Sequence, residues 1–330
     1  MRIISGIQPT NVVTLGNYLG AMRNFVLMQD EFKDADIIVF IADLHSITVP
    51  QERQQLKKNI KTLAALYIAV GLDPSRCHIF IQSEVPSHAE LSFVLECQSY
   101  IGEMERMIQF KEKSKKEGAS VTTGLLTYPC LMAADILLYD SNLVPVGEDQ
   151  TQHVELTRDL AERFNAKYGN TFTVPEAYIS KQGARIMSLQ DPEKKMSKSD
   201  PNPKGYITLL DDINEVKNKI RRAITDSLGI VKYDEVNQKG LSNLMTIYSL
   251  LSGLSLKDIE KKYEGLGYKE FKEDLANIVG DELKKIQSKY NEIINSKELD
   301  EVLDEGREYA TKLATKKIDK VYKKIGLGRH

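Results

Sequence analysis

Residues 37–42, Ile-Ile-Val-Phe-Ile-Ala, form an unbroken apolar run that constrains the fold more than any other stretch. The run follows Asp36, and the polar residues Asp43 and His45 come directly after it. A strand with this pattern is buried on both faces of a parallel sheet, because helices cover each side. In such sheets ligands bind outside the carboxyl ends of the strands. The segment from Asp36 to His45 therefore predicts a parallel sheet with a site beside its last residues.

Helices alternate with further strands in the first part of the chain. The other apolar segments of strand length are Arg2–Gln8, His78–Val85 and Leu143–Val146. Between two of the strands, apolar residues recur every three or four positions from about 51 to 70, and Gly71 supplies a C-terminal stop. Strands that alternate with helices predict an α/β sheet with right-handed crossovers.

The pattern changes near residue 200, where strand signals nearly vanish. Helical periodicity then runs through residues 207–229, 241–251, 256–263, 268–295 and 298–325. We therefore predict two domains, a Rossmann-like parallel-sheet domain over residues 1–199 and an all-α domain over residues 200–330.

The last predicted helix carries a stripe of basic residues at fourfold spacing. The stripe consists of Lys312, Lys316, Lys320 and Lys324. Such a stripe is able to contact nucleic-acid phosphates. The alternative is that it complements the helix dipole, because the same helix begins with acidic residues.

Composition excludes several other classes of protein. The chain has 330 residues, of which 42% are hydrophobic and 28% charged, as in ordinary globular proteins. The net charge of −2 does not favour nonspecific nucleic-acid binding. The longest apolar run, Leu63–Val70, is too short to cross a bilayer, and the first residues do not form a signal peptide, so we expect a cytoplasmic protein. The three cysteines lie far apart and predict neither disulfides nor a zinc site.

The segment from Lys194 to Asp200 carries three lysines and two serines and has no helix or strand pattern. Pro192 precedes it, and Pro201 and Pro203 follow it. Lysines and hydroxyls in a loop suit an oligophosphate ligand, whose charge they neutralise. Short lysine–serine loops are also common as solvated surface, so the pattern alone leaves both interpretations open.

A helix is expected to open at Thr14-Leu15-Gly16-Asn17, after the first strand and a turn at residues 8–11. Free backbone N–H groups at a helix start bind phosphate, and Thr14 and Asn17 would add side-chain hydrogen bonds. The alternative is that Thr14 or Asn17 only caps the helix.

Asp135 is the single charged residue in a helix predicted over residues 127–139, which is otherwise apolar nearly all round. A buried carboxylate is costly unless it accepts hydrogen bonds. An arginine or a backbone amide of the protein would satisfy it. A ligand donor, such as an indole N–H or a tyrosine hydroxyl, would satisfy it equally well.

The order of these motifs resembles that of the class I aminoacyl-tRNA synthetases, and most closely the bacterial-type tryptophanyl-tRNA synthetases. The resemblance extends over almost the whole chain and rests on residues 5–10, 14–17, 126–129, 132–137, 147–150 and 195–199. It implies a ligase that activates L-tryptophan with Mg-ATP, releases pyrophosphate, and transfers the amino acid to the terminal ribose of tRNA(Trp). It implies Mg²⁺ bound through the ATP phosphates, no zinc and no organic cofactor. The chain shows no Ser-His-Asp or Cys-His arrangement, and this chemistry needs none, since positioning and charge stabilisation suffice.

The resemblance also assigns roles to matched residues. The catalytic group would comprise Lys195, Lys198, Asn17 and Gln8, with the two lysines on the α-phosphate and the leaving pyrophosphate. The other residues expected to bind ATP are Pro9, Thr10, Lys113, Gly16, Gly147, Glu148, Asp149, Ile186, Met196, Ser197 and Ser199. Asp135 would accept the indole N–H, and the rest of the tryptophan pocket would be Gly6, His45, Tyr128, Met132 and Gln150.

Two positions depart from the family pattern. The class signature His-Ile-Gly-His, commonly Thr-Ile-Gly-Asn in the tryptophan branch, reads Thr-Leu-Gly-Asn at residues 14–17. Ile4 stands where an aromatic residue is frequent, which removes a stacking partner for the indole.

Three other functions would share part of this pattern. A tyrosyl-tRNA synthetase would be expected to have a histidine-rich first signature, and a nucleotidyltransferase of the same superfamily would lack the helical domain. A noncatalytic tRNA- or nucleotide-binding paralogue would be expected to have lost lysines that this loop retains. Members of the family are homodimers, and the apolar residues of Leu91–Met107 would line such an interface.

Overall fold

A computed structural model describes residues 1–10, 12–117, 121–147, 150–179 and 185–329, apart from the side chains of residues 113 and 115–117. Its five strands are all parallel and lie in the order β3-β2-β1-β4-β5. They are β1 (Arg2–Ile7), β2 (Asp36–Ile41), β3 (Cys77–Ile81), β4 (Leu143–Pro145) and β5 (Glu176–Tyr178). The predicted parallel α/β sheet is therefore confirmed.

The strands differ from the predicted ones in two places. The third strand ends at Ile81 and not at Val85, because Gln82–Glu84 forms a 3-10 turn that takes the chain away from the sheet. β5 was not predicted, since it has only three residues and none of them is fully buried.

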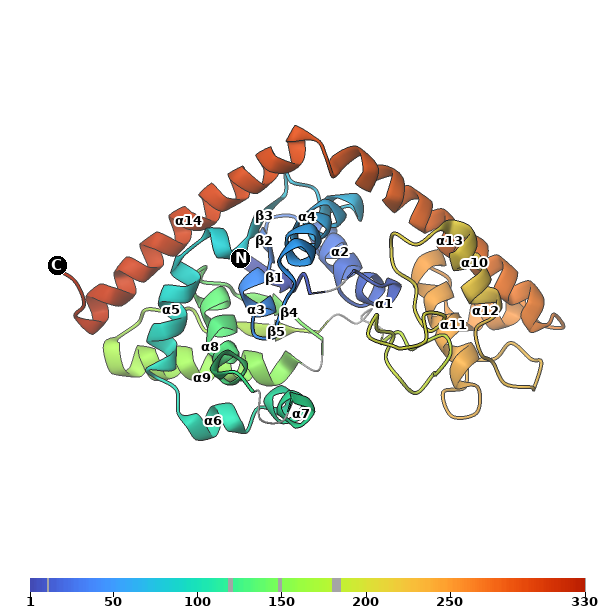
Figure 1. Ribbon diagram of the computed structural model, residues 1–330, viewed down its shortest axis with the longest axis horizontal. Helices are drawn as coiled ribbons and strands as arrows, with labels where there is room; N and C mark the ends of the chain where they lie inside the picture. The colour runs from blue at the N-terminus through green and yellow to red at the C-terminus, as the bar shows by residue number, and fades with distance from the viewer. Residues whose placement is uncertain (11, 118–120, 148–149, 180–184, 330) are drawn as a thin grey trace.

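Helices cover both faces of the sheet and form a hydrophobic core on each. Because successive side chains of a strand point to opposite faces, Ile37, Val39 and Ile41 of β2 lie in one core and Ile38 and Phe40 in the other. Residues of α2 and α4 share the first core, and residues of α5, α8 and α9 share the second. Figure 1 shows the sheet between these helices. The continuous apolar run predicted this arrangement.

Helices and turns connect the strands in each crossover. The connection from β1 to β2 contains α1 (Leu15–Asn17), a π-helical turn η1 (Tyr18–Met22) and α2 (Arg23–Glu31). The connection from β2 to β3 contains α3 (Asp43–Ser46) and α4 (Arg53–Ala69). The 3-10 turn η2 (Gln82–Glu84), α5 (Ser87–Glu96), α6 (Ile101–Glu105), α7 (Ile108–Glu117) and α8 (Thr123–Leu137) precede β4, and α9 (Thr151–Tyr168) precedes β5. Gly71 has a φ of +110°, so glycine suits this position just after α4.

The second half is helical, as predicted, although the helix expected over residues 207–229 is shorter. Its helices are α10 (Ile213–Arg221), α11 (Lys239–Ser252), α12 (Leu256–Lys262), α13 (Tyr268–Ile293) and α14 (Lys297–Ile325). The two long helices meet at residues 294–296, at the top of Figure 1, and run apart from there. α13 packs on α10 and α11, and also on α4 of the sheet part.

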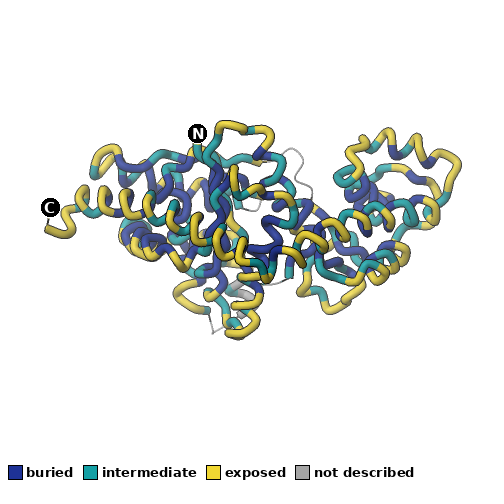
Figure 2. Tube along the Cα trace, turned by 90° about the horizontal axis from the view of Figure 1, so that it is seen from above, coloured by how far each residue is buried: buried dark blue, intermediate teal, exposed yellow. Residues whose placement is uncertain are grey.

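The final helix does not stay with the helical half, in which the sequence placed it. α14 returns to the sheet, packs along the edge strand β3, and contributes Ala310, Ala314, Ile318 and Val321 to the core on the α5–α8 side. In Figure 2 buried and exposed residues alternate along this helix. An edge strand covered in this way cannot pair with another chain. The domain boundary at residue 200 remains a prediction.

The basic residues of α14 divide between two environments. Lys317 is buried and pairs with Asp140, with 2.5 Å between Nζ and Oδ1. Lys320 donates to the carbonyl oxygen of Thr171 at 3.2 Å. Lys312, Lys316 and Lys324 are exposed. Part of the basic content of this helix therefore attaches it to the loops beside α8 and α9.

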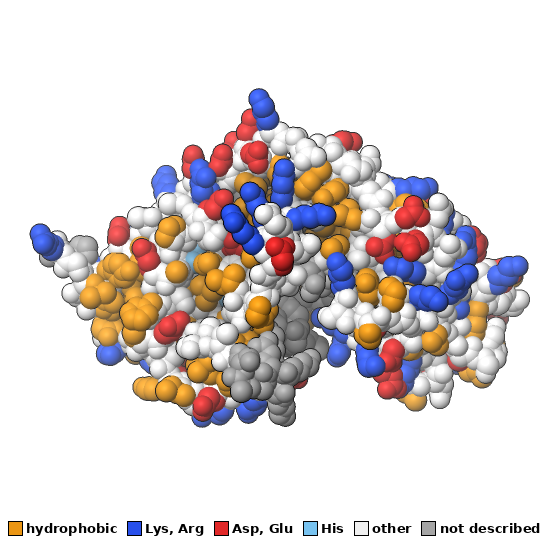
Figure 3. All heavy atoms as spheres, in the orientation of Figure 1, with side chains coloured by type: hydrophobic (Ala, Val, Ile, Leu, Met, Phe, Trp, Pro, Cys, Tyr) orange, Lys and Arg blue, Asp and Glu red, His pale blue; other side chains and the backbone are white. Residues whose placement is uncertain are grey.

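Exposed apolar side chains gather near the segment predicted as an interface. Phe93 of α5, Tyr100 before α6, Ile101 of α6 and Ile108 of α7 are each more than half exposed. Figure 3 shows a group of hydrophobic side chains on the side of the molecule that carries α5 and α6, and charges of both signs scattered over the rest of that view. Over the described residues, no helix is both long enough and apolar enough to cross a membrane.

Candidate active site

A cavity of about 360 Å³ opens at the carboxyl ends of β1 and β4. These two strands are neighbours, and the strand order reverses between them, since the chain proceeds from β1 to β2 on one side and from β4 to β5 on the other. Parallel α/β sheets bind their ligands at such a reversal. Residues 4–8 and 144–147 supply two of its walls, and α8, α3 and the π-helical turn supply others.

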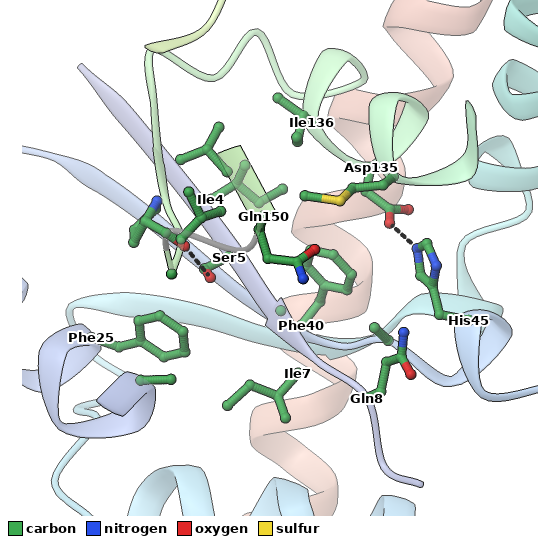
Figure 4. Close-up of a pocket in the computed structure, with 18 of the residues that line it drawn as sticks. Ile4, Ser5, Ile7, Gln8, Phe25, Phe40, His45, Asp135, Ile136 and Gln150 are labelled. Carbon is green, nitrogen blue, oxygen red and sulfur yellow. Dashed lines mark hydrogen bonds and ion pairs between the residues drawn. The ribbon is translucent and has the colours of Figure 1, made fainter. Parts of the chain in front are cut away.

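The six residues predicted for the tryptophan pocket all line this cavity. Met132 and Asp135 come from α8, His45 from α3, and Gly6 from β1; Tyr128 and Gln150 complete the set. Figure 4 shows His45 and Asp135 beside one another at one end of the cavity, with Gln150 between them and Ser5. The structure therefore brings together residues that lie up to 144 positions apart, from Gly6 to Gln150.

Asp135 is 1% exposed, and it accepts three hydrogen bonds from side chains. His45 Nε2 lies 2.7 Å from Oδ2, while Gln82 Nε2 and His88 Nδ1 each lie 2.6 Å from Oδ1. Burial alone would raise the pKa of Asp135, but interactions with His45 and His88 outweigh it and hold that pKa below its ordinary value. The carboxylate is therefore ionised, and its protein partners are histidines and a glutamine in place of the arginine or backbone amide expected.

Tyr128 stands across from His45 with a hydrogen-bonded hydroxyl. Its oxygen lies 2.8 Å from His153 Nε2 and 3.2 Å from Gln109 Oε1. The rings of His45 and Tyr128 meet edge to face, with their centroids 6.1 Å apart. These contacts set the orientation of two walls of the cavity.

The helix start at residues 14–17 is capped by its own side chains. The Thr14 hydroxyl accepts from the Asn17 backbone N–H, and the Thr14 backbone N–H donates to Asn17 Oδ1 at 3.1 Å. Thr14 and Asn17 therefore do cap the helix, and the phosphate role of Asn17 stays a prediction. Asn17 uses Oδ1 in the cap, and its Nδ2 donor has no acceptor among the residues that the structure describes. Asn17 also lines the cavity.

A π-helical turn follows this cap, and its inner surface belongs to the site. Gly20 and Ala21 of Tyr18–Met22 line the cavity. Turns of this kind are rare and occur frequently at functional sites. The sequence predicted that a helix opens at residues 14–17 but not the π turn, because the period of a single π turn cannot be distinguished in a short segment.

The lysine loop lies against this helix start. A side chain at Gly16 would place its Cβ 3.4 Å from Met196 Cβ and 3.5 Å from Ile186 Cβ, so both residues touch Gly16. Met196 and Ile186 are buried, and the Met196 N–H donates to the Ile186 carbonyl at 2.9 Å. A second link joins the same region, since the Leu15 N–H donates to the carbonyl of Ile207 at 2.8 Å.

The three lysines of the loop differ in their partners. Lys194 forms an ion pair with Asp191 at 2.8 Å. Lys195 and Lys198 are exposed and have no ion pair with any described residue. Ser197 and Ser199 bond to one another through their hydroxyls at 2.8 Å. Buried Met196 anchors the loop, which is therefore not plain solvated surface.

The remaining predicted residues have varied positions. Gln8 and Gly147 line the cavity, whereas Pro9 and Thr10 follow β1 without lining it. Glu148 and Asp149 lie outside the described residues, and Lys113 lies in α7 with its side chain outside the description. Within the described ranges, no group of three or more His, Cys, Asp or Glu side chains is arranged to hold a metal ion.

Several lining residues carried no sequence signal that would separate them from ordinary core. Phe40 is the clearest case, because it lies within the apolar run of β2. A Cβ on Gly6 would come within 2.7 Å of its ring, so the ring packs directly against the backbone of β1. Figure 4 shows Phe40 and Ile4 in the same cavity. An aromatic ring is thus present at the site even though residue 4 is isoleucine. Further examples are Asn24, Phe25, Gln109 and Tyr178.

Comparison with known proteins gives a consistent result. The family described as class I tRNA synthetases (W and Y) matches residues 1–284. The tryptophan–tRNA ligase of Bacillus subtilis is 60% identical over 327 residues, which cover 99% of this chain and 98% of that protein. A tryptophanyl-tRNA synthetase structure from Mycoplasma pneumoniae superposes with a TM-score of 0.90 at 38% identity, covering 99% of this chain and 98% of that one. The Campylobacter jejuni synthetase in complex with ADP and tryptophan gives 0.83 at 36% identity, covering 99% and 100%.

Proposed function

This chain belongs to the class I tRNA synthetases for tryptophan and tyrosine, and on that premise we propose how its cavity carries out the reaction. The protein is an aminoacyl-tRNA ligase that activates L-tryptophan with ATP and charges tRNA with the product. The tyrosine alternative is not favoured, because full-length relatives at 55–60% identity are tryptophan–tRNA ligases.

One observation carries the assignment of roles: the contact of Gly16 with Met196 and Ile186. It brings the lysine loop beside the helix start that faces the cavity, and Asp135 lies in the same cavity. Two cations of this loop, Lys195 and Lys198, form no ion pair with a described residue. The distribution suits a ligand with an oligophosphate at one end and a ring N–H donor at the other. Tryptophan and ATP, held together, have these two ends.

In the proposed reaction, a carboxylate oxygen of tryptophan attacks the α-phosphorus of Mg-ATP. The new bond joins that oxygen to phosphorus, and the bond between the α-phosphorus and the bridging oxygen breaks, releasing pyrophosphate. Lys195 and Lys198 neutralise the charge that develops on the α-phosphate and on the leaving group. Asn17 would donate its free Nδ2 to a phosphate oxygen, and Gln8 would hold the ATP beside β1.

Asp135 would accept the indole N–H at the other end of the cavity. An indole nitrogen only donates, so an ionised carboxylate is a complementary partner. Phe40, Ile4 and Met132 would surround the ring with apolar surface. In the second step, the terminal ribose of tRNA(Trp) attacks the activated carbonyl, and AMP leaves.

The proposed phosphate role of the loop is tested by substituting its lysines one at a time. Lys195→Ala and Lys198→Ala should each slow ATP–pyrophosphate exchange with tryptophan by at least ~10²-fold, as expected for the loss of a transition-state donor. Lys194→Ala is the matched control, because Lys194 already pairs with Asp191. Near-wild-type exchange in Lys195→Ala and Lys198→Ala would show that these lysines have no role in the activation step.

The assembly and location of the enzyme are part of the same proposal. We assign residues 200–330 to the anticodon side of the tRNA, Mg²⁺ to the ATP phosphates, and the activity to the cytoplasm, where charged tRNA is used. A homodimer would bury the exposed apolar residues of α5 to α7, Phe93, Tyr100, Ile101 and Ile108. A tRNA would then be able to contact both subunits.

A further inference from the structure

We infer that Gln82 and His88, supported by Tyr139, are positioning residues that fix the carboxylate of Asp135 and so set the preference of the site for a ring N–H. The inference rests on the proposed role of Asp135 as the indole acceptor. None of the three residues lines the cavity, and all three are fully buried. They come from three elements: the 3-10 turn after β3, the start of α5, and the residues just after α8.

The orientation of the Gln82 amide is determined by its other partner. Its Oε1 accepts from the backbone N–H of Leu44 at 3.1 Å, and a backbone N–H can only donate. The Nε2 group must therefore face Asp135, to whose Oδ1 it donates at 2.6 Å. Since Leu44 is the neighbour of His45 in α3, Gln82 also ties the His45 segment to the carboxylate.

His88 is fixed in a similar way. Its Nδ1 faces the ionised Asp135, so that nitrogen carries the proton and donates to Oδ1 at 2.6 Å. In the neutral ring, Nε2 then accepts from the hydroxyl of Tyr139 at 2.8 Å. Burial and the charge of Asp135 both raise the pKa of Tyr139, which keeps its hydroxyl protonated as a donor. Every proton in the chain from Tyr139 to His88 to Asp135 therefore points toward the carboxylate.

The acceptor capacity of Asp135 can then be counted. An ionised carboxylate offers about four lone-pair positions, two on each oxygen. Gln82 and His88 occupy both positions on Oδ1, and His45 occupies one on Oδ2. Counting bonds from the described residues only, the remaining position is on Oδ2, the oxygen bonded to cavity-lining His45, and it can be filled only by a donor. A ligand ring without an N–H leaves that buried position empty, which is costly.

The proposal predicts that loss of the supporting donors lowers discrimination more than it lowers the chemistry. The two substrates to compare by ATP–pyrophosphate exchange are tryptophan and β-(3-benzothienyl)alanine, which has nearly the same ring shape with sulfur in place of the N–H. The quantity to compare is the kcat/KM for tryptophan divided by the kcat/KM for the analogue. In His88→Leu and Gln82→Leu this ratio should fall at least ~10-fold, because the Asp135 carboxylate is no longer fixed in its orientation. KM for ATP should stay within about twofold in both. His88→Asn should retain most of the preference, since its amide N–H replaces the Nδ1 donor.

A variant that removes fewer atoms from the core is less disruptive to the fold. Tyr139→Phe removes one oxygen from the network and should lower the same ratio severalfold, by releasing the His88 ring. The matched control is Tyr263→Phe, which removes a buried hydroxyl that bonds to Asp274 in the helical half and should leave the ratio unchanged.

Asp135→Asn separates this inference from the function on which it rests. If Asp135→Asn lowers the ratio while His88→Leu, Gln82→Leu and Tyr139→Phe all retain the wild-type ratio, the positioning role is wrong and the acceptor role stands. If Asp135→Asn also leaves the ratio unchanged, Asp135 is not the indole acceptor. If the ratio falls in every variant except His88→Asn and the Tyr263→Phe control, both the positioning role and the acceptor role of Asp135 are supported.

Discussion

Asp135 holds a buried charge on a helix whose other buried side chains are almost all apolar, and three side-chain donors from other elements offset the cost of its burial. The same donors orient it, so the charge that the fold must stabilise is also available to a ligand. A group of this kind contributes to both stability and binding, and the two contributions can be measured separately.

For binding, Asp135→Asn should weaken tryptophan by roughly 10-fold or more, the usual loss for a hydrogen bond to a charged group. ATP affinity should change little, because Asn17 and the lysine loop, and not Asp135, are the groups proposed to bind its phosphates. Equilibrium binding of each ligand to wild type and variant gives both values. A variant that loses ATP affinity and keeps tryptophan affinity would refute the assignment.

For stability, the lowered pKa of Asp135 gives a defined pH window. A carboxyl whose pKa is lower in the folded state stabilises the fold above the unfolded value of ~3.9, and that contribution is lost as pH falls through the folded pKa. Wild type should therefore exceed Asp135→Asn in free energy of unfolding most clearly above about pH 5. The difference should shrink below about pH 4 in urea titrations; a difference that stays constant there would argue against an ionised Asp135.

At the scale of elements, α14 joins the two halves because it packs on β3, and Gly306 permits the closest approach. A Cβ at this position would lie 1.9 Å from the carbonyl oxygen of Ile79, which belongs to the backbone of β3 and cannot move aside as a flexible side chain would. Glycine to alanine in a helix interior normally stabilises by about 1 kcal/mol. Gly306→Ala should do the opposite.

We expect Gly306→Ala to lower the free energy of unfolding by a few kcal/mol, in the range of overpacked cores, about 1–3 kcal/mol. Thr315→Ala on the exposed face of the same helix is the control and should be neutral or slightly stabilising. Thermal and urea unfolding of the three proteins decides the matter. Stabilisation in Gly306→Ala would mean that α14 does not lie this close to the sheet.

The elements also show what a single sequence specifies. The apolar run of β2 predicted a strand buried on both faces, and the periodicity of residues 268–325 predicted two long helices, because each pattern repeats over many residues. The three residues of β5 were too few for a pattern. The packing of α14 was missed, because its small residues, Gly306, Ala310 and Ala314, give no indication of which surface they contact.

The sequence identified some residues of the site and missed others. Asp135 was conspicuous because a charge interrupts an apolar helix, and the lysine loop because it lacks any other pattern. Gln82, His88 and Phe40 were not identified, since buried polar and aromatic residues near strand ends resemble ordinary core until their partners are known. Long-range hydrogen bonds, such as His45 to Asp135, depend on the tertiary fold.

For the whole molecule, the exposed apolar surface of α5 to α7 predicts self-association. Phe93 is 67% exposed and Ile101 70% exposed, and large apolar side chains that gather on one side of a protein usually mark an interface. Phe93→Asp and Ile101→Asp should each shift the protein toward monomer in sedimentation velocity. Val236→Asp, at a 77% exposed position in the helical half, should not. A wild-type protein that sediments as a monomer at micromolar concentration would contradict the homodimer.

The central claim is that the protein activates tryptophan with ATP. It is tested most directly by ATP–pyrophosphate exchange on one preparation of the wild-type protein, with tryptophan and tyrosine supplied in parallel. We predict that tryptophan drives exchange and that tyrosine does not, because the full-length relatives at 55–60% identity are tryptophan–tRNA ligases. Exchange driven by tyrosine and not by tryptophan would contradict the account.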